Sequence, residues 1–553
     1  MKDTIERAVT SAVEDLTKRG LLPPGSGDAA TVSIPQNKEF GDYATNIAMI
    51  SASRAKKSPR EIASLIRGEL EQRNDLFSEV TIAGPGFINF TVRPELWIKV
   101  LDDIHEQGTA YGCSAYGQGR KVQVEFVSAN PTGPLHIGHG RGAAVGDTLV
   151  RIMKTAGYEV QAEYYINDIG NQMNLLGLSV LSRYRELFDQ GISFPENGYQ
   201  GEYIRTIASE LTRIHGEGLL ALDHHEAVHV CREYAARSIL EGIKDDLIRF
   251  EVHFDNWFSE SSLYDQHKVD ETLEHLKTSG LSYENDGALW FRTTRFGDEK
   301  DRVLRKQDGS LTYFAPDIAY HRDKLERGFT KIIDIWGADH HGYVPRMRAA
   351  IQALDSEPES FHALLIQLVS LVRDGKPVSM STRSGEFVTL REILDEVGTD
   401  AARYFFLMRR CDSHLVFDLD LAKKKTEENP VFYIQYAHAR ICSILRNAAE
   451  LGLAPDMSQV DRTLLEQDDD LDLIKVLATY PDVLVSCAAD LEPHRVAFYL
   501  LELATEFHRF YNKNRVISES GPGTMARLVL VDAVRQVLVN ALALMGIVAP
   551  ESM

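Results

Sequence analysis

Two histidines three residues apart, His136 and His139, stand where a helix is expected to begin. They belong to segment 124–142, in which a β-type run leads through Asn-Pro-Thr-Gly into a helix that starts with small residues. Glycines there admit a nucleotide close to the backbone, and the free N–H groups and positive dipole end of the helix attract phosphate. The histidines share one side of the first turn, so they can donate hydrogen bonds to phosphoryl oxygens as charge builds up on them. The segment therefore predicts an adenylyl-transfer site.

The spacing His-x-Gly-His is weak evidence by itself, because paired helical histidines are more often structural or metal-binding. The context strengthens the prediction, since the pair follows a β run and a turn and opens a long helix. The segment matches neither the GxxxxGK[ST] loop of P-loop enzymes nor the GxGxxG fingerprint of dinucleotide-binding folds. It therefore indicates a different kind of nucleotide site.

A second polar cluster follows another apolar run. Gly337, Asp339 and His340 come directly after residues 332–335, so we expect them at the carboxyl edge of a sheet, where ligands of open α/β folds bind. A plain strand-to-helix turn would give the same pattern. We do not expect zinc here, because His340 and His341 are adjacent and point apart.

The elements that position these residues indicate a parallel sheet. From Lys121 onward, short β-rich runs at 122–127, 331–336 and 364–372 alternate with long helical stretches. This alternation is typical of a doubly wound α/β core with crossover helices. The stretch from about 170 to 300 is charged and its pattern is helical, which indicates an insertion in the sheet.

The segments on either side of this core differ from it. Residues 1–105 mix helix and strand signals, with an N-cap, a proline and a capping-box acid at 58–61 and a strand pair at 80–82 and 87–92. After Asn429-Pro430 almost everything to Met553 is expected to be helical. Breaks are expected near Gly452, Pro481, Pro493 and 521–523. The sequence thus predicts a multidomain α/β protein: an α+β module over 1–105, a parallel-sheet domain over 106–428 and an all-α bundle over 429–553.

Composition limits the partners that the protein can bind. The 553 residues carry 60 Lys and Arg against 81 Asp and Glu, a net charge of −21. No global basic field exists to hold nucleic acid without selectivity, so an RNA partner must contact local basic patches.

Other features point to a cytoplasmic, reduced protein. The sequence has no run of 18 or more apolar residues, and residues 1–16 lack the apolar core and cleavage site of a signal peptide. The 5 cysteines lie far apart without a CxxC pair, so neither a disulfide framework nor a cysteine zinc site is indicated. We expect reduced, buried thiols.

Segment 124–142 resembles the HIGH signature of class I aminoacyl-tRNA synthetases and, in its wider wording, that of the arginyl-tRNA synthetases of bacterial type. The resemblance covers nearly the whole chain. Further matching segments are residues 163–168, 170–172, 201–203, 257–263, 336–342 and 433–440.

This resemblance implies a two-step reaction in a Rossmann-like catalytic domain. ATP and arginine give arginyl-adenylate and pyrophosphate, and the terminal ribose of the tRNA then accepts the arginyl group. Members of the family usually need bound tRNA for the first step. The resemblance implies Mg²⁺ with the ATP, no zinc, no organic cofactor and a monomer. It also implies an N-terminal module at the folded corner of the tRNA and a C-terminal anticodon-binding domain.

An arginine pocket needs carboxylates, because a guanidinium offers a fixed fork of donors that acidic side chains match bidentately. The match to the family's motifs assigns this role to Glu125 and Asp317, and Tyr313 lies one helical turn before Asp317, where the two can share a face. Asn130 and His139 correspond to the residues that hold the α-amino and carboxylate ends of the substrate. Without the resemblance, Glu125 would be an edge-strand acid and Asp317 a helix-start acid.

The ATP site also follows from the resemblance, which places the ribose and adenine at the cluster after residue 336. The implied ATP-binding residues are His136, Gly138, His139, Gly337, Asp339, His340 and Met380.

The second class I signature departs from the family. The Lys-Met-Ser-Lys-Ser loop corresponds here to residues 379–385, with serine and threonine at both lysine positions. Some arginine enzymes that lack this lysine carry another one three residues before the first signature histidine, but Gly133 stands there. We expect Arg383 to supply the charge over the β- and γ-phosphates and to be catalytic with His136 and His139. Lys376 is an alternative, and Arg383 could also be a surface residue.

RNA contacts are implied at the helical domain, with Tyr433, Tyr436 and Met553 at the anticodon. An aromatic stripe at helical spacing is ordinarily core, so packing is the other interpretation. The basic runs 423–425 and 54–57 could contact phosphate or carry solvated charges.

Two other functions fit parts of the sequence. A related HxGH nucleotidyltransferase that makes a small-molecule adenylate would use the core but leave the flanking domains without a role. A paralogue that binds tRNA without catalysis would explain the altered lysine loop.

Overall fold

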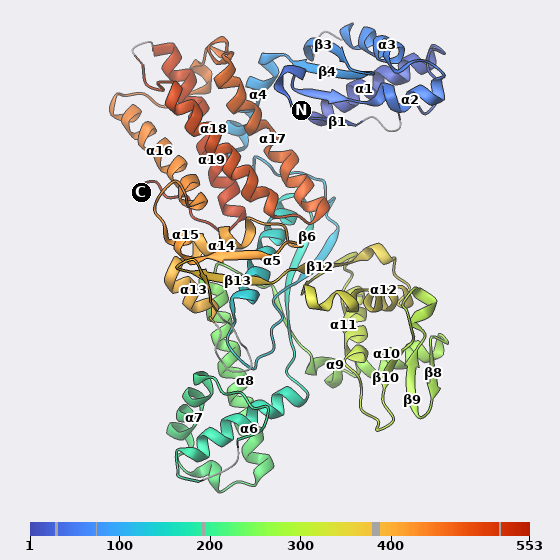
Figure 1. Ribbon diagram of the computed structural model, residues 1–553, viewed down its shortest axis with the longest axis vertical. Coiled ribbons are helices and arrows are strands. Elements are labelled where there is room, and N and C mark those ends of the chain that lie inside the picture. The colour runs from blue at the N-terminus through green and yellow to red at the C-terminus, as the bar shows by residue number, and fades with distance from the viewer. Residues whose placement is uncertain (28–30, 73–74, 191–193, 379–387, 519–520) are drawn as a thin grey trace.

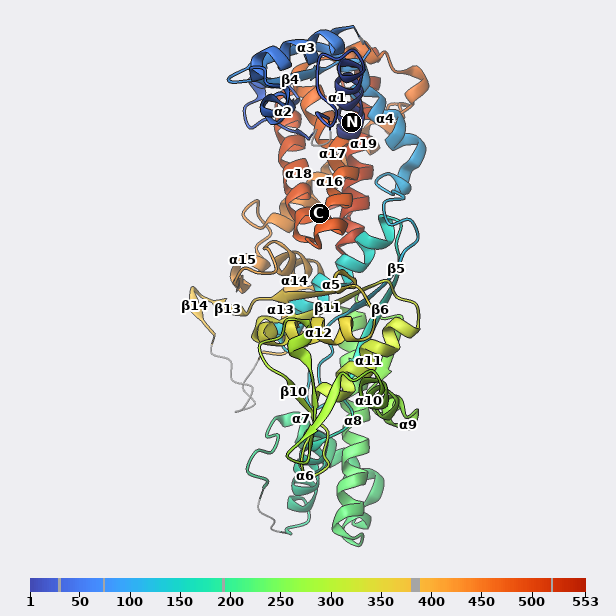
Figure 2. The same cartoon turned by 90° about the vertical axis from the view of Figure 1, so that its right-hand side faces the viewer.

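The computed structural model describes residues 1–27, 31–72, 75–190, 194–378, 388–518 and 521–553. Along the long axis the N-terminal module lies at the upper end of the C-terminal helical bundle, and the sheet domain follows below the bundle (Figures 1 and 2). Two lobes project from the sheet domain at the end away from the N-terminal module. The fold class predicted from the sequence is confirmed, because an antiparallel module, a parallel sheet and a helical bundle are all present.

The N-terminal module is an antiparallel sheet, in the order β1-β2-β4-β3, packed with helices. One of these helices, α3, begins where the capping residues predict. The Ser58 side chain accepts a hydrogen bond from the Glu61 N–H, and the Glu61 carboxylate accepts one from the Ser58 N–H. The elements are α1 (Lys2–Lys18), β1 (Val32–Ser33), β2 (Tyr43–Thr45), α2 (Ile47–Ala55), α3 (Pro59–Glu71), β3 (Phe77–Ala83) and β4 (Phe87–Val92).

The central domain is built on a parallel sheet with the strand order β12-β11-β5-β6-β7. The chain runs from β5 outward to β6 and β7 and then returns to the other side of β5 for β11 and β12. The strand order therefore reverses between β5 and β11, which is the switch point where open α/β sheets bind ligands. The strands are β5 (Lys121–Glu125), β6 (Glu159–Ile166), β7 (Asn256–Ser259), β11 (Lys331–Gly337) and β12 (Phe361–Ile366).

Helices connect these strands and form the two lobes. The helix α5 (Ile137–Thr155) links β5 to β6, and α11 (Phe314–Glu326) precedes β11. The first lobe, which we call the helical insertion, consists of α6 (Asn171–Glu186), α7 (Glu202–His215) and α8 (His224–Arg249). The second lobe contains α9 (Ser261–Asp265), α10 (Lys268–Thr278), β8 (Ser282–Asn285), β9 (Ala288–Phe291), β10 (Arg302–Arg305) and α12 (Val344–Ala353), which pack with α11.

The prediction that residues 170–300 are a helical insertion is wrong for the part after Arg249, where strands form as well as helices. The helical insertion ends at Arg249; β7 then joins the main sheet, and β8, β9 and β10 form an antiparallel sheet of their own. These strands are short and partly charged, and their pairing partners determine their conformation more than local propensity does.

The single apolar run predicted at 364–372 is divided between two sheets. β12 pairs with β11 in the main sheet, whereas β13 (Val369–Arg373) pairs with β14 (Lys376–Pro377) and β15 (Leu415–Asp418). Gln367 lies between them, and its N–H donates to the Cys411 carbonyl at 2.9 Å. Apolar residues indicate that a strand is buried, but they do not indicate which sheet it joins. The run therefore gave no sign that the chain leaves one sheet and enters another at Gln367.

The C-terminal unit is helical as predicted, but one predicted break is wrong. Pro481 lies inside α17, and the helix continues because Leu477, Tyr480 and Leu484 around it are buried. The free energy gained by burying these side chains outweighs the cost of the backbone hydrogen bond that proline removes from a helix interior. Helix α4 (Pro94–Gln107) also packs here, against α17 and α19. The remaining helices are α13 (Leu390–Val397), α14 (Thr399–Leu407), α15 (Leu419–Lys423), α16 (Pro430–Glu450), α17 (Asp468–Asp490), α18 (His494–Lys513) and α19 (Gly521–Leu544).

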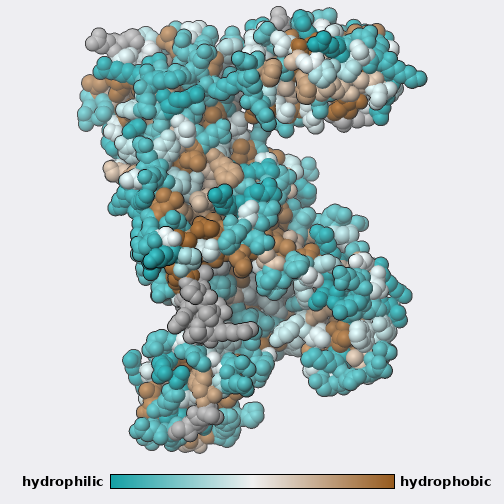
Figure 3. Space-filling view, viewed as in Figure 1, coloured by the Kyte–Doolittle hydropathy of each residue, from teal (hydrophilic) through white to brown (hydrophobic). Residues whose placement is uncertain are grey.

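The cysteine prediction holds for most of the thiols. Cys231, Cys411, Cys442 and Cys487 are buried and free, but Cys113 is exposed, because it lies in the turn between α4 and β5. Among the described residues, no helix is long and apolar enough to span a membrane. The face seen in Figure 3 is mostly hydrophilic, with apolar patches over the middle of the molecule.

Arg403 on α14 holds the central domain and the bundle together. Its side chain is fully buried, and its guanidinium donates to the Asp147 carboxylate at 2.5 Å, to the Phe250 carbonyl at 2.9 Å and to the Met545 carbonyl. A Cβ at Gly546 would lie 2.6 Å from the guanidinium, so only glycine fits at this position of the tail after α19. One cation thus satisfies groups from α5, the end of α8 and the C-terminal tail.

We expect Arg403→Met to destabilise the protein by about 3 kcal/mol or more, because Asp147 and the carbonyls would lose a buried partner. Thermal and urea denaturation would measure this as a lower Tm and midpoint. The control is Arg409→Met, which removes an exposed arginine just after α14. Equal Tm values for the two variants would contradict the role of Arg403.

Candidate active site

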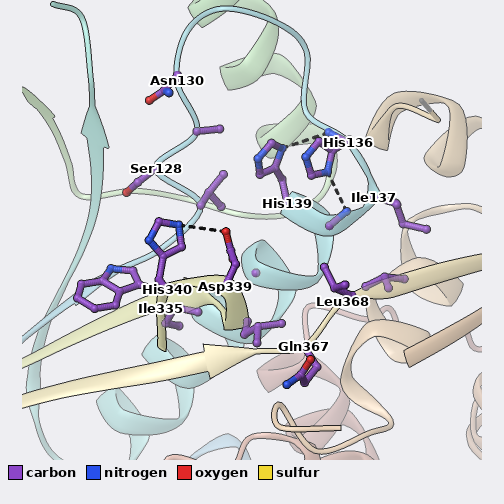
Figure 4. Close-up of a pocket in the computed structure, with 18 residues that line it drawn as sticks. Ser128, Asn130, His136, Ile137, His139, Ile335, Asp339, His340, Gln367 and Leu368 are labelled. Carbon is purple, nitrogen blue, oxygen red and sulfur yellow. Dashed lines mark hydrogen bonds and ion pairs between the residues drawn. The ribbon is translucent and has the colours of Figure 1, made fainter. Parts of the chain in front are cut away.

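A cleft of about 600 Å³ opens at the switch point of the sheet. Its walls come from the loop after β5, the N-terminus of α5 and the residues after β11 and β12. Figure 4 shows His136 and His139 side by side at the start of α5, across the cleft from Asp339 and His340. The structure therefore brings together two polar clusters that are about 200 residues apart in the sequence.

The two histidines form a cap on α5. The Nδ1 atom of His136 accepts the Gly138 N–H at 3.1 Å, and the Nδ1 atom of His139 accepts the His136 N–H at 3.2 Å. The rings stack with centroids 3.7 Å apart. Burial lowers the pKa of both imidazoles, and burial together with His136 lowers that of His139 to about 3. Each ring is thus neutral at pH 7 and carries its proton on Nε2, which makes it a hydrogen-bond donor at the cleft.

A second cavity of about 270 Å³ adjoins the first. Ser128, Asn130, Gly337 and His340 line both cavities, so the two meet at the ends of β5 and β11. The second cavity is acidic, because it is lined by the carboxylates Glu125, Asp317 and Asp334.

Glu125 and Asp334 are neighbours in register on β5 and β11 and share a buried lysine. The Lys324 ammonium donates to Glu125 Oε2 at 2.6 Å and to Asp334 Oδ1 at 2.8 Å, and His321 Nε2 lies 2.9 Å from Asp334 Oδ2. Burial raises the pKa of Glu125. Burial would also raise that of Asp334, but Lys324 and His321 outweigh it and lower the pKa to about 2.

Asp317 lies at the start of α11 and accepts a hydrogen bond from the Tyr343 hydroxyl. Burial raises its pKa. The Tyr313 side chain does not join this cavity: it is 67% exposed, because Tyr313 is the residue before the first turn of α11. Tyr343 supplies the aromatic neighbour of Asp317 instead.

The other predicted ATP-site residues are only partly placed. Gly337, Asp339 and His340 line the larger cavity together with Gly138. Met380 and Arg383 lie outside the described residues. Within the described part of the chain, no group of three or more His, Cys, Asp or Glu residues is arranged to hold a metal ion.

The predicted site did not include four residues that line or support the acidic cavity: Asp334, Lys324, His321 and Tyr343. Asp334 had a detectable signal, because a buried acid inside an apolar strand needs a partner. The spacing of Lys324, seven residues after Asp317 and thus on the same face of α11, was a weaker signal. Nothing local marked Tyr343 as a partner of Asp317.

The residues predicted to bind RNA form a half-exposed aromatic cluster in the bundle. Tyr433 and Tyr436 both pack against His508, with ring centroids 4.5 and 6.0 Å away. The Arg440 guanidinium lies between the rings of Tyr436 and Tyr511, at 4.5 and 4.8 Å. The cluster is thus neither pure core nor free surface.

Met553 ends a C-terminal tail that packs along α16 and lies apart from the aromatic cluster. Gln435 donates to the Val548 carbonyl, His438 Nδ1 lies 2.8 Å from the Pro550 carbonyl, and Arg446 donates to the Glu551 carbonyl. The tail therefore runs along α16 toward Arg446, which is about 15 Å beyond Tyr436 at the rise of a helix. Met553 is 52% exposed there.

Glu260 lies directly after β7 and interacts with Tyr165, which lines the acidic cavity. Its side chain is almost fully buried, at 4% exposed. Burial first, and then the carboxylates of Asp317 and Asp168, raise its pKa to about 7. Near neutral pH this carboxyl group is thus partly protonated.

In comparisons with known proteins, all three parts of the chain match domains of arginyl-tRNA synthetases. Family models match residues 3–92 (arginyl tRNA synthetase N terminal domain), 101–420 (tRNA synthetases class I (R), catalytic domain) and 434–553 (DALR anticodon binding domain). The chain is 53% identical over 554 residues to an arginine–tRNA ligase of Syntrophotalea carbinolica and 52% identical over 554 residues to one of Geobacter sp., with 100% of each chain covered. It also resembles the solved structure of Thermus thermophilus arginyl-tRNA synthetase, with a TM-score of 0.78, 22% identity and 100% of each chain covered.

We expect Glu260→Gln to raise the Tm at pH 8 and to leave it nearly unchanged at pH 5. The folded-state pKa lies above the ordinary value of 4.5, so folding favours the protonated form. That contribution is complete below pH 4.5 and is lost as the pH rises through about 7. Thermal denaturation across pH 5–8 would measure it. A Tm difference that does not change with pH would contradict the assignment.

Proposed function

The chain belongs to the class I arginyl-tRNA synthetases and is an arginine–tRNA ligase, and from this premise we propose which of its residues carry the two steps of the reaction. In the first step the arginine carboxylate attacks the α-phosphorus of ATP and pyrophosphate leaves. In the second, a hydroxyl of the terminal tRNA ribose attacks the activated carbonyl and AMP leaves. The observation that supports this assignment is the junction of a histidine-lined cleft with an acidic cavity.

Glu125 and Asp317 bind the guanidinium of arginine in the acidic cavity. Asp334 adds a third carboxylate, so the cavity keeps negative charge even after Lys324 is paired. A planar cation with several donors matches these acceptors, whereas a neutral analogue leaves them without donors. Asn130 and His139, near the junction, hold the α-amino and carboxylate ends.

ATP lies in the larger cleft. His136 and His139 donate from Nε2 to the α-phosphate region, where negative charge builds up as the substrate carboxylate attacks. Gly138 lets the phosphates approach the start of α5, and Gly337, Asp339 and His340 contact the ribose and adenine. Met380 and Arg383 complete the site from the second signature. ATP enters as its magnesium complex, and we propose no zinc and no organic cofactor.

The flanking units bind the tRNA. Residues 429–553 read the anticodon with Tyr433, Tyr436 and Met553, which the half-exposed aromatic cluster supports, since unpaired bases stack on such rings. Residues 1–105 contact the folded corner of the tRNA, and residues 106–428 carry the catalysis. We propose a monomeric enzyme of the cytoplasm. The altered lysine loop supports one second candidate, a catalytically weak tRNA-binding paralogue.

We expect Asp317→Asn and Glu125→Gln each to raise the KM for arginine by about 5- to 150-fold, because each would leave buried donors without a charged acceptor at a cost of about 1–3 kcal/mol. Steady-state aminoacylation measures this effect. The matched control is Glu326→Gln, an exposed acid at the end of α11. An unchanged KM in both pocket variants would contradict the proposed pocket.

We expect the protein to catalyse ATP–pyrophosphate exchange with arginine, and Arg383→Ala to slow it by about tenfold to a thousandfold, on the scale of one lost transition-state contact. The assay is run with and without arginine tRNA. A larger loss in Lys376→Ala would transfer the role to Lys376. Exchange that ignores tRNA would favour a small-molecule enzyme, and no exchange under any condition would favour the binding paralogue.

A further inference from the structure

Two segments that match the family, residues 170–172 and 201–203, have no role in the mechanism so far. Both belong to the helical insertion, at the starts of α6 and α7. Each sends one side chain to the loop 130–133, which connects β5 to the histidine cap of α5. The insertion is therefore in direct contact with the loop that carries Asn130.

The backbone before this loop is strained. Val127 and Ser128 have φ values of +67° and +39°, in the left-handed region that non-glycine residues avoid. Such a conformation persists only where surrounding contacts fix it. The sheet supplies part of this support, because the Tyr164 hydroxyl donates to the Ala129 carbonyl at 2.8 Å and the Tyr165 N–H donates to Ser128 Oγ at 3.1 Å.

Beyond Ala129 the insertion supplies two further contacts. The Asn130 side-chain NH₂ donates to Gln172 Oε1 at 2.7 Å. The Tyr203 hydroxyl donates to the Thr132 carbonyl at 2.8 Å. Thus α6 holds the side chain of Asn130, and α7 holds the backbone two residues farther along.

The tyrosine lies against two glycines. A Cβ at Gly133 would lie 3.1 Å from the Tyr203 hydroxyl, and a Cβ at Gly201 would collide with the Tyr203 ring. A side chain at either position would therefore disturb the hydrogen bond to Thr132. This explains why small residues precede the tyrosine and end the loop.

The bond to Gln172 fixes which way the Asn130 amide faces. Because the NH₂ group donates to Gln172, the Oδ1 atom is the one left to accept a hydrogen bond from a ligand. The α-ammonium group of an amino acid is a donor without acceptors, so it needs that oxygen. Without Gln172 the amide could rotate and present NH₂ to the ammonium.

We propose that Gln172 and Tyr203 are positioning residues, through which the helical insertion orients Asn130 toward the α-ammonium group of the bound amino acid. The proposal rests on the role proposed above for Asn130. It also gives the insertion a function in amino-acid binding, in addition to its place in the fold.

The test compares two ligands that differ only in the α-ammonium group, L-arginine and 5-guanidinopentanoate. Equilibrium binding of each to the full chain is measured by titration calorimetry. We expect Gln172→Met to weaken arginine binding by about 3- to 10-fold, the scale of one hydrogen bond, and to leave 5-guanidinopentanoate binding unchanged. Tyr203→Phe should act in the same direction, and Gln172→Glu, which keeps an acceptor, should restore arginine binding.

Matched controls come from the same insertion. Tyr234→Phe removes a hydroxyl that donates to Glu210, and Asn174→Ala removes an acceptor of Arg232, so neither should change either affinity. Equal losses for both ligands in Gln172→Met would mean a purely structural role and would overturn the proposal. If Asn130→Ala discriminates between the ligands and Gln172→Met does not, the proposal fails while the role of Asn130 stands. If Asn130→Ala does not discriminate between the ligands either, the positioning proposal and the proposed role of Asn130 both fail.

Discussion

A row of carboxylates buried in the middle of the parallel sheet is the constraint on which the rest of the structure depends. Asp334, Glu125 and Glu163 are neighbours in register across β11, β5 and β6. Like charges cannot remain together in a dry interior unless cations are placed among them. Helix α11 and its C-terminal cap supply these cations: Lys324 lies between Asp334 and Glu125, and the guanidinium of the capping residue Arg327 donates to both oxygens of Glu163, at 2.5 and 2.8 Å.

The position of α11 therefore follows from charge balance as much as from apolar packing. Once Lys324 and Arg327 are paired, the start of the helix must lie at the ends of β5 and β11, which brings Asp317 beside Glu125. Glu125 and Asp334 of these ion pairs thus also line the cavity that we propose binds the guanidinium of arginine. The strained loop after β5 joins this cavity to the histidine cap, so three separate parts of the chain meet at the proposed active site.

The fold could be predicted where the signal was local. The capping box at Ser58 and Glu61 marked the start of α3, and the alternation of short β runs with helices indicated the parallel core. Prediction failed where contacts with distant segments determined the secondary structure. Strands β8 to β10 exist because they pair with one another, the run 364–372 is divided because two sheets share it, and Pro481 stays helical because its neighbours are buried.

The site divides in the same way. The sequence determined the chemical types: a histidine pair at a helix start, two acids that the resemblance to the family assigns to a guanidinium, and a second signature without its lysines. Tertiary structure alone decided that the Tyr343 hydroxyl, and not the Tyr313 side chain, contacts the Asp317 carboxylate, and that Lys324 lies between Glu125 and Asp334. The physical reason is that spacing along the chain fixes which residues share a helix face or a strand edge. Contacts between distant segments, by contrast, depend on how buried charges and apolar surfaces are satisfied by the whole fold.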